Sequence, residues 1–219
     1  QGLRHYTQEP WLDDQQLRWR EAPLHSADET VLRPVAQPFS PDGGLRLLRG
    51  NLGRAVVKVS AVKPQHRVIC APAVVVNSQQ ALHDLYKNGS LNKDFIAVVR
   101  EQGPQANGMP ELHKLTPMLG VLQDQGFQVA LVTDGRMSGA SGKVPAAIHL
   151  SPESKNGGMV AKVRDGDMVC LNCNTGVLTL EVSDAELASR PLPERVADEL
   201  WQSGQGLFGL FRQQDRKST

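Results

Sequence analysis

The feature that most constrains the fold is a series of short apolar runs, rich in β-branched residues and bounded by glycine, proline or asparagine. Such runs are typical of buried strands. They occupy residues 55–59, 74–76, 95–99, 128–133, 168–173 and 177–182. Capped or leucine-spaced helical segments lie between or after them, at residues 78–89, 111–125 and 183–190. The pattern predicts a mixed α/β fold, a β-barrel or sandwich with helices packed on the outside.

The flanking segments differ in character from this central part. Residues 1–44 are polar and carry several prolines, which predicts a connecting segment with one helical turn around residues 14–20. Residues 45–190 form the predicted barrel-like domain, and residues 191–219 a helical and polar tail. Because the chain starts at Gln1 without an initiator methionine, we expect it to be processed or cut from a longer protein.

Composition excludes several classes of function. Twenty-four basic and 23 acidic residues give a net charge of +1, which argues against nucleic-acid binding driven by bulk charge. No run of apolar residues reaches the length of a membrane span. Three cysteines, an odd number, fit a reducing compartment better than a disulfide framework, so we expect a cytoplasmic protein.

The first candidate site is the loop TDGRMSGASGK at residues 133–143, directly after an apolar run. Its glycines allow close approach to a ligand, and its backbone N–H groups offer an anion site. It is not a Walker A loop, because Val144 replaces the required serine or threonine. An ordinary glycine-rich turn is the alternative.

The second candidate is the loop at residues 100–114, which also leaves a predicted strand and leads into a helix. If the two strands are parallel, both loops lie at the edge where ligands bind in open α/β sheets. Cys170 and Cys173 also suggest a metal pair, but alternation along a strand places them on opposite faces. We therefore expect two ordinary strand cysteines.

Both loops resemble the dihydroxy-acid and 6-phosphogluconate dehydratase family. The run VALVTDGRMSG at residues 129–139 matches the family signature, and the continuation ASGKVPAAIH resembles the phosphogluconate branch. QGPQANGMPELHKL at residues 102–115 does so as well. GNLGRA at 50–55 and AKVRDGD at 161–167 extend the resemblance from about residue 30 to 190.

The resemblance implies a fold and a cofactor. It makes this chain the C-terminal part of a two-domain enzyme, a swivelling β-barrel-type domain beside a larger N-terminal domain. That absent domain carries the cysteines of an iron–sulfur cluster, expected to be 4Fe-4S, and none of the three cysteines here matches a cluster ligand. A homodimer is also expected, without nucleic-acid or membrane partners.

The implied reaction is dehydration of 6-phospho-D-gluconate to 2-dehydro-3-deoxy-6-phospho-D-gluconate in the Entner–Doudoroff pathway. The serine of the family motif, Ser138 here, is implied as the base, and nearby positive charge or a metal must lower the pKa of its hydroxyl. The predicted substrate-binding residues are Arg100, Asn107, His113, Lys114, Asp134, Arg136, Ser141 and Lys143. Of these, Arg100, His113, Lys114 and Lys143 are the candidate anion contacts.

One position departs from the dihydroxy-acid branch. Gln102 stands where that branch has a metal-binding glutamate, which puts a divalent cation such as Mg²⁺ in doubt at this position. Two alternatives stay open: a dehydratase of an unphosphorylated sugar acid or a dihydroxy acid, and a non-catalytic binding module.

Overall fold

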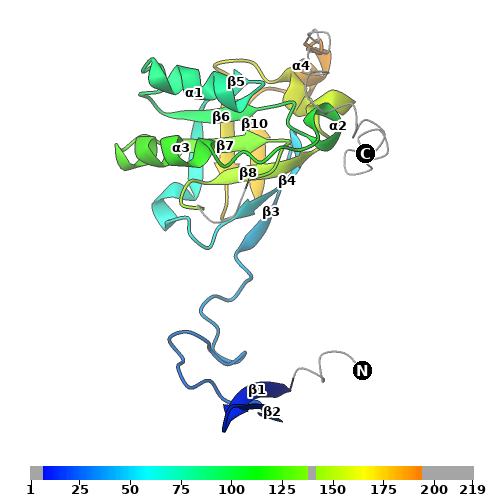
Figure 1. Ribbon diagram of the computed structural model, residues 1–219. Coiled ribbons are helices and arrows are strands. Elements are labelled where there is room, and N and C mark those ends of the chain that lie inside the picture. Colours follow the sequence, from blue (N-terminus) through cyan, green and yellow to red (C-terminus); the bar gives the residue numbers. More distant parts are fainter. Residues whose placement is uncertain (1–6, 138–141, 194–219) are drawn as a thin grey trace. The chain divides into compact units, whose positions relative to one another are not determined.

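The computed structural model describes residues 7–137 and 142–193 (Figure 1). The chain divides into two compact units, Gln1–Gly43 and Gly44–Thr219. The predicted helical stretches of the tail and the loop centre at 138–141 lie outside the described residues. Over the part that is described, no helix is long and apolar enough to cross a membrane.

The first unit contains a β-hairpin. Strand β1 (Gln8–Asp13) pairs antiparallel with β2 (Gln16–Glu21), and Asp14 and Gln15 join them with φ of 45° and 67°. A two-residue connection with both φ values positive matches the right-handed twist of a hairpin. The predicted helical turn around residues 14–20 is therefore wrong, because this segment alternates between charged and apolar side chains with a period of two.

The second unit is a closed barrel of eight strands in the order β10-β3-β4-β8-β7-β6-β5-β9. Neighbours from β5 to β8 are parallel, β10 is parallel to β3, and the remaining pairs are antiparallel. The sequence left barrel and sandwich open, and the structure has a mixed barrel. The strands are β3 (Leu45–Gly50), β4 (Gly53–Lys58), β5 (Val68–Val76), β6 (Phe95–Val99), β7 (Val129–Thr133), β8 (Ala146–Ser151), β9 (Met168–Asn172) and β10 (Val177–Leu180).

Two apolar clusters lie on opposite faces of the parallel strands. Along β6, Ile96 and Val98 belong to the cluster shared by all the barrel strands, and Phe95, Ala97 and Val99 belong to the other. The second cluster also contains side chains of helices α1 (Gln79–Lys87) and α3 (Leu115–Asp124). Strands buried on both faces read as continuous apolar runs, which is why β6 and β7 were visible in the sequence.

Helix ends follow the capping signals closely. Ser78 Oγ accepts a hydrogen bond from Ala81 N–H at 3.2 Å, as predicted, and Ser183 caps α4 (Asp184–Ser189) in the same way. Helix α3, however, begins at Leu115 and not at 111. Pro117 lies in its first turn, where a missing N–H costs no helical hydrogen bond. The short helices are α2 (Pro104–Asn107), η2 (Pro64–His66), η4 (Ser154–Asn156) and η5 (Met159–Lys162).

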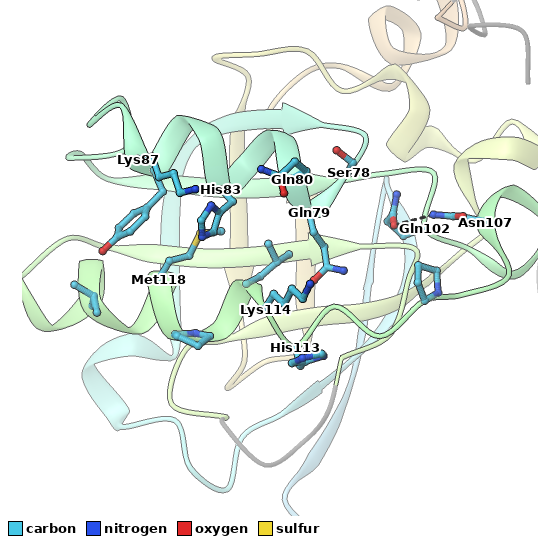
Figure 2. A pocket seen from close by; sticks show the side chains of 15 residues that line it. Ser78, Gln79, Gln80, His83, Lys87, Gln102, Asn107, His113, Lys114 and Met118 are labelled. Carbon is cyan, nitrogen blue, oxygen red and sulfur yellow. Dashed lines mark hydrogen bonds between the residues drawn. The ribbon is translucent and has the colours of Figure 1, made fainter. Parts of the chain in front are cut away.

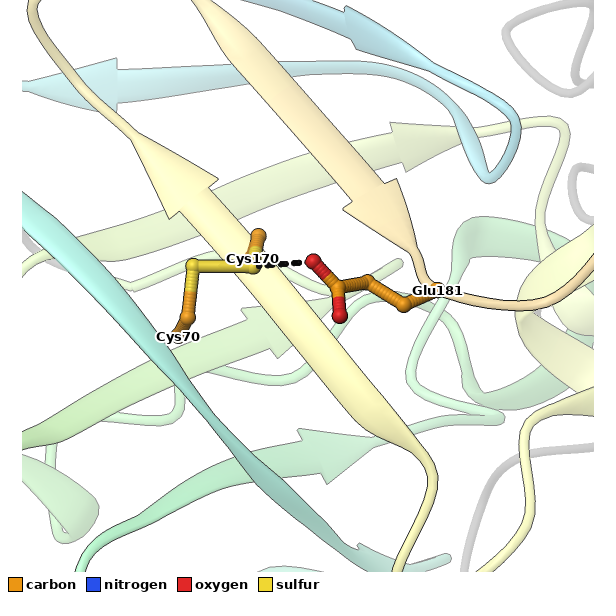
Figure 3. Close-up of side chains that lie close together, drawn as sticks. All are labelled: Cys70, Cys170 and Glu181. Carbon is orange, nitrogen blue, oxygen red and sulfur yellow. Dashed lines mark hydrogen bonds between the residues drawn. A yellow bond between two sulfur atoms is a disulfide. The ribbon is translucent and has the colours of Figure 1, made fainter.

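The cysteines correct one expectation. Cys70 on β5 lies directly opposite Cys170 on β9, and the two form a disulfide across the strands (Figure 3). The prediction of an ordinary strand cysteine is wrong for Cys170, because pairing in the barrel brings a distant cysteine beside it. The disulfide also runs against the argument from the odd number of cysteines, which favoured a reducing compartment. Cys173 is free and 1% exposed. It lies in the barrel cluster while Cys170 does not, consistent with the predicted alternation.

Candidate functional site

The carboxyl ends of four parallel strands meet at one edge of the barrel. Strands β5, β6, β7 and β8 end at Val76, Val99, Thr133 and Ser151. The two candidate loops follow β6 and β7, which are parallel neighbours in register from Phe95 and Val129 onward. The expected convergence of these loops at one edge is confirmed, and it rests on the parallel pairing that the sequence left undetermined.

Asp134 ties the loops of this edge together. It is fully buried, and its Oδ2 accepts hydrogen bonds from the Ser154 N–H at 2.9 Å and the Ser154 hydroxyl at 2.6 Å. Backbone N–H groups of Glu101 and Gln102 donate to the same carboxylate at 3.2 and 2.9 Å. A carboxylate with this many donors fixes backbone. Its predicted contact with substrate stays a prediction.

Glu153 performs a similar task at the start of α2. It is 1% exposed, and its two oxygens accept from the N–H groups of Gln105 and Ala106 at 3.0 and 3.3 Å. A Cβ on Gly103 would stand 1.8 Å from Glu153 Oε2, so only glycine fits. Sequence reasoning missed Glu153 and Ser154, because no local signal shows that their loop returns to the edge.

Gln102 turns its amide toward protein atoms. Its Nε2 donates to the Asn77 carbonyl at 2.6 Å and reaches the carbonyls of Arg100 and Glu101 at 3.2 and 3.1 Å. Its Oε1 accepts from Asn107 Nδ2 at 3.2 Å, and the residue is 3% exposed. A cation at this oxygen would have to displace the Asn107 amide. The environment of Gln102 therefore does not fit a divalent metal site.

Arg136 connects the two candidate loops. Its Nε donates to the Met109 carbonyl at 2.8 Å, and its Nη1 lies 3.0 Å from Glu111 Oε2. Leu112 N–H donates to the Arg136 carbonyl at 3.1 Å. These contacts hold the loops side by side over several residues, immediately before the motif serine at position 138.

Three non-glycine residues around this edge have a left-handed backbone. Glu101, Met109 and His149 have φ of 62°, 59° and 57°. Each such conformation costs about 1 kcal/mol or more and persists where surrounding contacts impose it. His149 N–H, for example, donates to the Gly135 carbonyl at 2.9 Å. Strain of this kind gathers at functional sites, which supports the choice of this edge.

A cleft of about 970 Å³ opens beside the edge, between α1 and the start of α3 (Figure 2). Two predicted anion contacts, His113 and Lys114, line it and are exposed, and Asn107 lies at one end beside Gln102. Helix α1 contributes His83 and Lys87, one helical turn apart, at the other end. Sequence reasoning missed this pair, because nothing in the sequence shows that α1 faces the second loop.

The other two predicted cations lie elsewhere. Arg100 donates to Asn77 Oδ1 at 2.8 Å and to the Ala161 carbonyl at 2.7 Å, and it lines a separate hollow on the side of η5. Lys143 Nζ lies 2.6 Å from Asp124 Oδ2 and lines a hollow of about 440 Å³ that His113 shares. Of the four candidate cations, the structure thus brings His113 and Lys114 into one cleft and places Lys143 next to it.

Ser138 and Ser141 lie outside the described residues. The segment before them ends at Met137, whose sulfur lies 3.1 Å from the hydroxyl of Thr116 on α3. The segment after them begins with Gly142 and Lys143, which line the hollow shared with His113. The described parts of this loop thus meet α3 on both sides of the predicted base.

The three cysteines of the chain do not fit an iron–sulfur cluster. Cluster ligands are thiolates, whereas Cys70 and Cys170 are bonded to each other. Burial raises the pKa of the Cys173 thiol to about 11, so it stays protonated at neutral pH. Glu181 Oε1 lies 3.2 Å from Cys170 Sγ (Figure 3). Cys70, Cys170 and Glu181 are the one group of at least three potential metal ligands within the described ranges.

The second unit is a closed mixed α/β barrel with polar loops after the carboxyl ends of its parallel strands. The chain belongs to the dihydroxy-acid/6-phosphogluconate dehydratase C-terminal family, whose model matches residues 30–218.

Several relatives resemble nearly the whole chain. It is 58% identical over 211 residues to a phosphogluconate dehydratase of Pseudomonas aeruginosa, covering 96% of this chain and 35% of the relative. The phosphogluconate dehydratase of Escherichia coli K12 is 54% identical over 214 residues, with 97% and 35% covered. A dihydroxy-acid dehydratase of Acetivibrio thermocellus is 39% identical over 167 residues, with 74% and 30% covered. The chain therefore spans about a third of the length of these relatives.

Proposed function

We propose that this chain is the C-terminal part of a hydro-lyase that converts 6-phospho-D-gluconate to 2-dehydro-3-deoxy-6-phospho-D-gluconate and water, a step of the Entner–Doudoroff pathway. The observation that carries the proposal is the gradient of similarity. Relatives named phosphogluconate dehydratase reach 58% identity over 96% of the chain, against 39% over 74% for the dihydroxy-acid dehydratase.

The charges around the cleft suit a substrate with two anionic ends. His113 and Lys114 from one loop and Lys87 from α1 line the cleft, and Lys143 lines the smaller hollow next to it. His113 lines both. We assign the phosphate to the larger cleft, where Lys87 and Lys114 act as point charges. The carboxylate and the reacting carbons belong near Lys143, which is five residues from Ser138 in the sequence.

In this scheme Ser138 takes the proton from C2 of the substrate. A serine hydroxyl does so only where positive charge stabilises its deprotonated form. Arg136 is held two residues away by Glu111 and the Met109 carbonyl, so its charge has a fixed position. Asp134 and Glu153 support the site by fixing the loop backbone, since both are buried among N–H donors.

The proposal extends to the complete protein. A 4Fe-4S cluster, as the family resemblance implies, would accept the departing C3 hydroxyl as a Lewis acid, and its ligands lie outside this chain. A swivelling barrel beside a larger N-terminal domain, a homodimer and a cytoplasmic location belong to the same proposal. The amide environment of Gln102 argues against a second metal at that residue.

Comparison of three substrates on the complete gene product tests the function. The protein is reconstituted with iron and sulfide without oxygen and assayed on 6-phosphogluconate, gluconate and 2,3-dihydroxyisovalerate. We expect kcat/KM to be at least about 100-fold higher for the phosphorylated acid, since two charged contacts to phosphate discriminate by about 3 kcal/mol. Equal values for gluconate would favour the unphosphorylated sugar acid. Absence of turnover with all three would favour the binding module.

A further inference from the structure

The hairpin at residues 8–21 has two unlike faces. Directly opposite residues in an antiparallel pair point to the same side. Pro10 is paired with Trp19 and Leu12 with Leu17, so these four side chains share one face. Leu12, Leu17 and Trp19 are 68%, 66% and 62% exposed. Among the described residues of its unit, this apolar face (Pro10, Leu12, Leu17 and Trp19) is exposed.

The charged side chains of the opposite face pair with one another. Arg20 lies 2.7 Å from Glu9 and 5.2 Å above the ring of Trp11, and Arg18 Nε lies 3.1 Å from Asp13 Oδ2. Its charges are paired along the strands, and its one aromatic ring is covered by a guanidinium. A face of this kind is suited to solvent, which leaves the apolar face as the one that requires a partner.

A two-stranded hairpin alone is only marginally stable in water and needs packing on its apolar side. A contiguous exposed apolar patch on such an element marks an interaction surface. Gln8 Nε2 and Glu21 Oε1, at the open end of the same face, are hydrogen-bonded to each other at 3.1 Å. The charge of Glu21 thus lies at the end of this face, and the four residues of the patch itself are uncharged, which favours an apolar partner.

The comparisons with relatives indicate which part of the polypeptide supplies that partner surface. The C-terminal family model starts at residue 30, after the hairpin, whereas the match to the Pseudomonas aeruginosa relative covers 96% of this chain and 35% of the relative. The hairpin thus precedes the C-terminal domain proper, and about two thirds of such a protein lies outside the aligned region. We propose that the apolar face of the hairpin docks on an apolar surface of the polypeptide that precedes Gln1. This inference rests on the proposed function, which makes the chain the C-terminal part of a longer enzyme.

Photo-crosslinking in the complete gene product tests the docking. A benzophenone amino acid replaces Leu17 in one variant and Trp19 in another, and cross-linked peptides are identified by mass spectrometry. We expect both positions to cross-link to residues upstream of Gln1 in the same polypeptide. The matched control replaces Arg18, which lies between them on the ion-paired face, and its yield of upstream cross-links should be at least about tenfold lower.

Three results would overturn the inference: cross-links mainly to residues 44–193, cross-links to a second copy in isotopically mixed samples, or no upstream cross-links from either position. Hydrogen exchange on the unsubstituted protein is a second readout that needs no substitution, so misfolding of a variant cannot affect it. We expect the paired amides of residues 8–21 to exchange at least about 100-fold more slowly than free peptide. Neither readout requires turnover, so a protein that cross-links as expected but does not dehydrate 6-phosphogluconate would refute the proposed function and leave the docking intact.

Discussion

Lys114 is the side chain whose removal reports most directly on anion binding. It is exposed in the cleft and has no hydrogen bond or ion pair among the described residues. We expect Lys114→Ala to raise KM for 6-phosphogluconate by about tenfold and to change kcat by less than about twofold, because a contact to a remote phosphate is equal in ground and transition states. Steady-state kinetics measure both. Lys93→Ala, an exposed lysine outside the cleft, is the matched control and should change neither.

Ser138 carries the proposed chemistry. Ser138→Ala in the complete enzyme should lower kcat by about 10²–10⁴-fold, the usual contribution of a positioned base. The circular dichroism spectrum and the thermal midpoint should stay unchanged. Turnover close to that of the unsubstituted enzyme would remove Ser138 from the role of base.

Asp134 tests whether the loops at the edge depend on one buried carboxylate. Asp134→Asn replaces an acceptor with an NH₂ group that faces N–H donors, which leaves buried groups unpaired. We expect the free energy of unfolding to fall by about 3 kcal/mol in urea titration of the 219-residue chain. Asp124→Asn, at an exposed ion pair with Lys143, should cost less than about 1 kcal/mol. Equal effects of the two substitutions would contradict the anchoring role.

At the scale of elements, α4 is fastened to the barrel by a buried ion pair. Arg190 is 6% exposed, Nη1 donates to Asp167 Oδ2, and Nη2 lies 3.0 Å from Asp167 Oδ1 and 2.7 Å from Glu186 Oε1. Burial acts to raise the pKa of Asp167. Hydrogen bonds from Arg190 and the Arg164 N–H, together with the charges of both arginines, outweigh it and hold the pKa below its ordinary value of 3.8.

This pair predicts a pH dependence with a definite sign. Because the folded-state pKa of Asp167 is depressed, its contribution to stability is complete above the unfolded value of 3.8 and is lost as pH falls through the lower folded value. Asp167→Asn should lower the free energy of unfolding by about 3 kcal/mol at pH 7, the cost of breaking a buried pair. The difference between the two proteins should shrink below about pH 4 in urea titrations at several pH values. A difference that stays constant down to pH 2 would contradict this.

The elements also show what could be predicted from the sequence. Buried strands such as β6 and β7, and helices with a serine cap, were found because their signal is local. Strand β3 was missed because arginines interrupt its apolar residues, and β8 because His149 and Ser151 do the same. The hairpin lacks an Asn-Gly or Asp-Gly turn. The two candidate loops follow neighbouring parallel strands, but Arg100 and Lys143 line other hollows than the cleft, since only tertiary pairing decides where a long side chain points.

At the scale of the whole molecule, the proposed reaction needs more than this chain. Its three cysteines are paired or buried, so none is suited to bind the cluster that the proposed reaction requires. We expect the isolated 219-residue chain, after the same anaerobic reconstitution, to turn over 6-phosphogluconate at least about 10³-fold more slowly than the complete enzyme. The assay follows formation of the 2-oxo acid. Comparable rates would place the Lewis acid within this chain.

The bond between Cys70 and Cys170 joins residues 100 positions apart, and both candidate loops lie within that span. Together with the backbone it makes one covalent ring that contains the whole carboxyl edge, from the end of β5 to η5. A protease that cuts either loop once would therefore open the ring without releasing a fragment. The nicked chain would run as one species until a thiol reductant separates its two pieces.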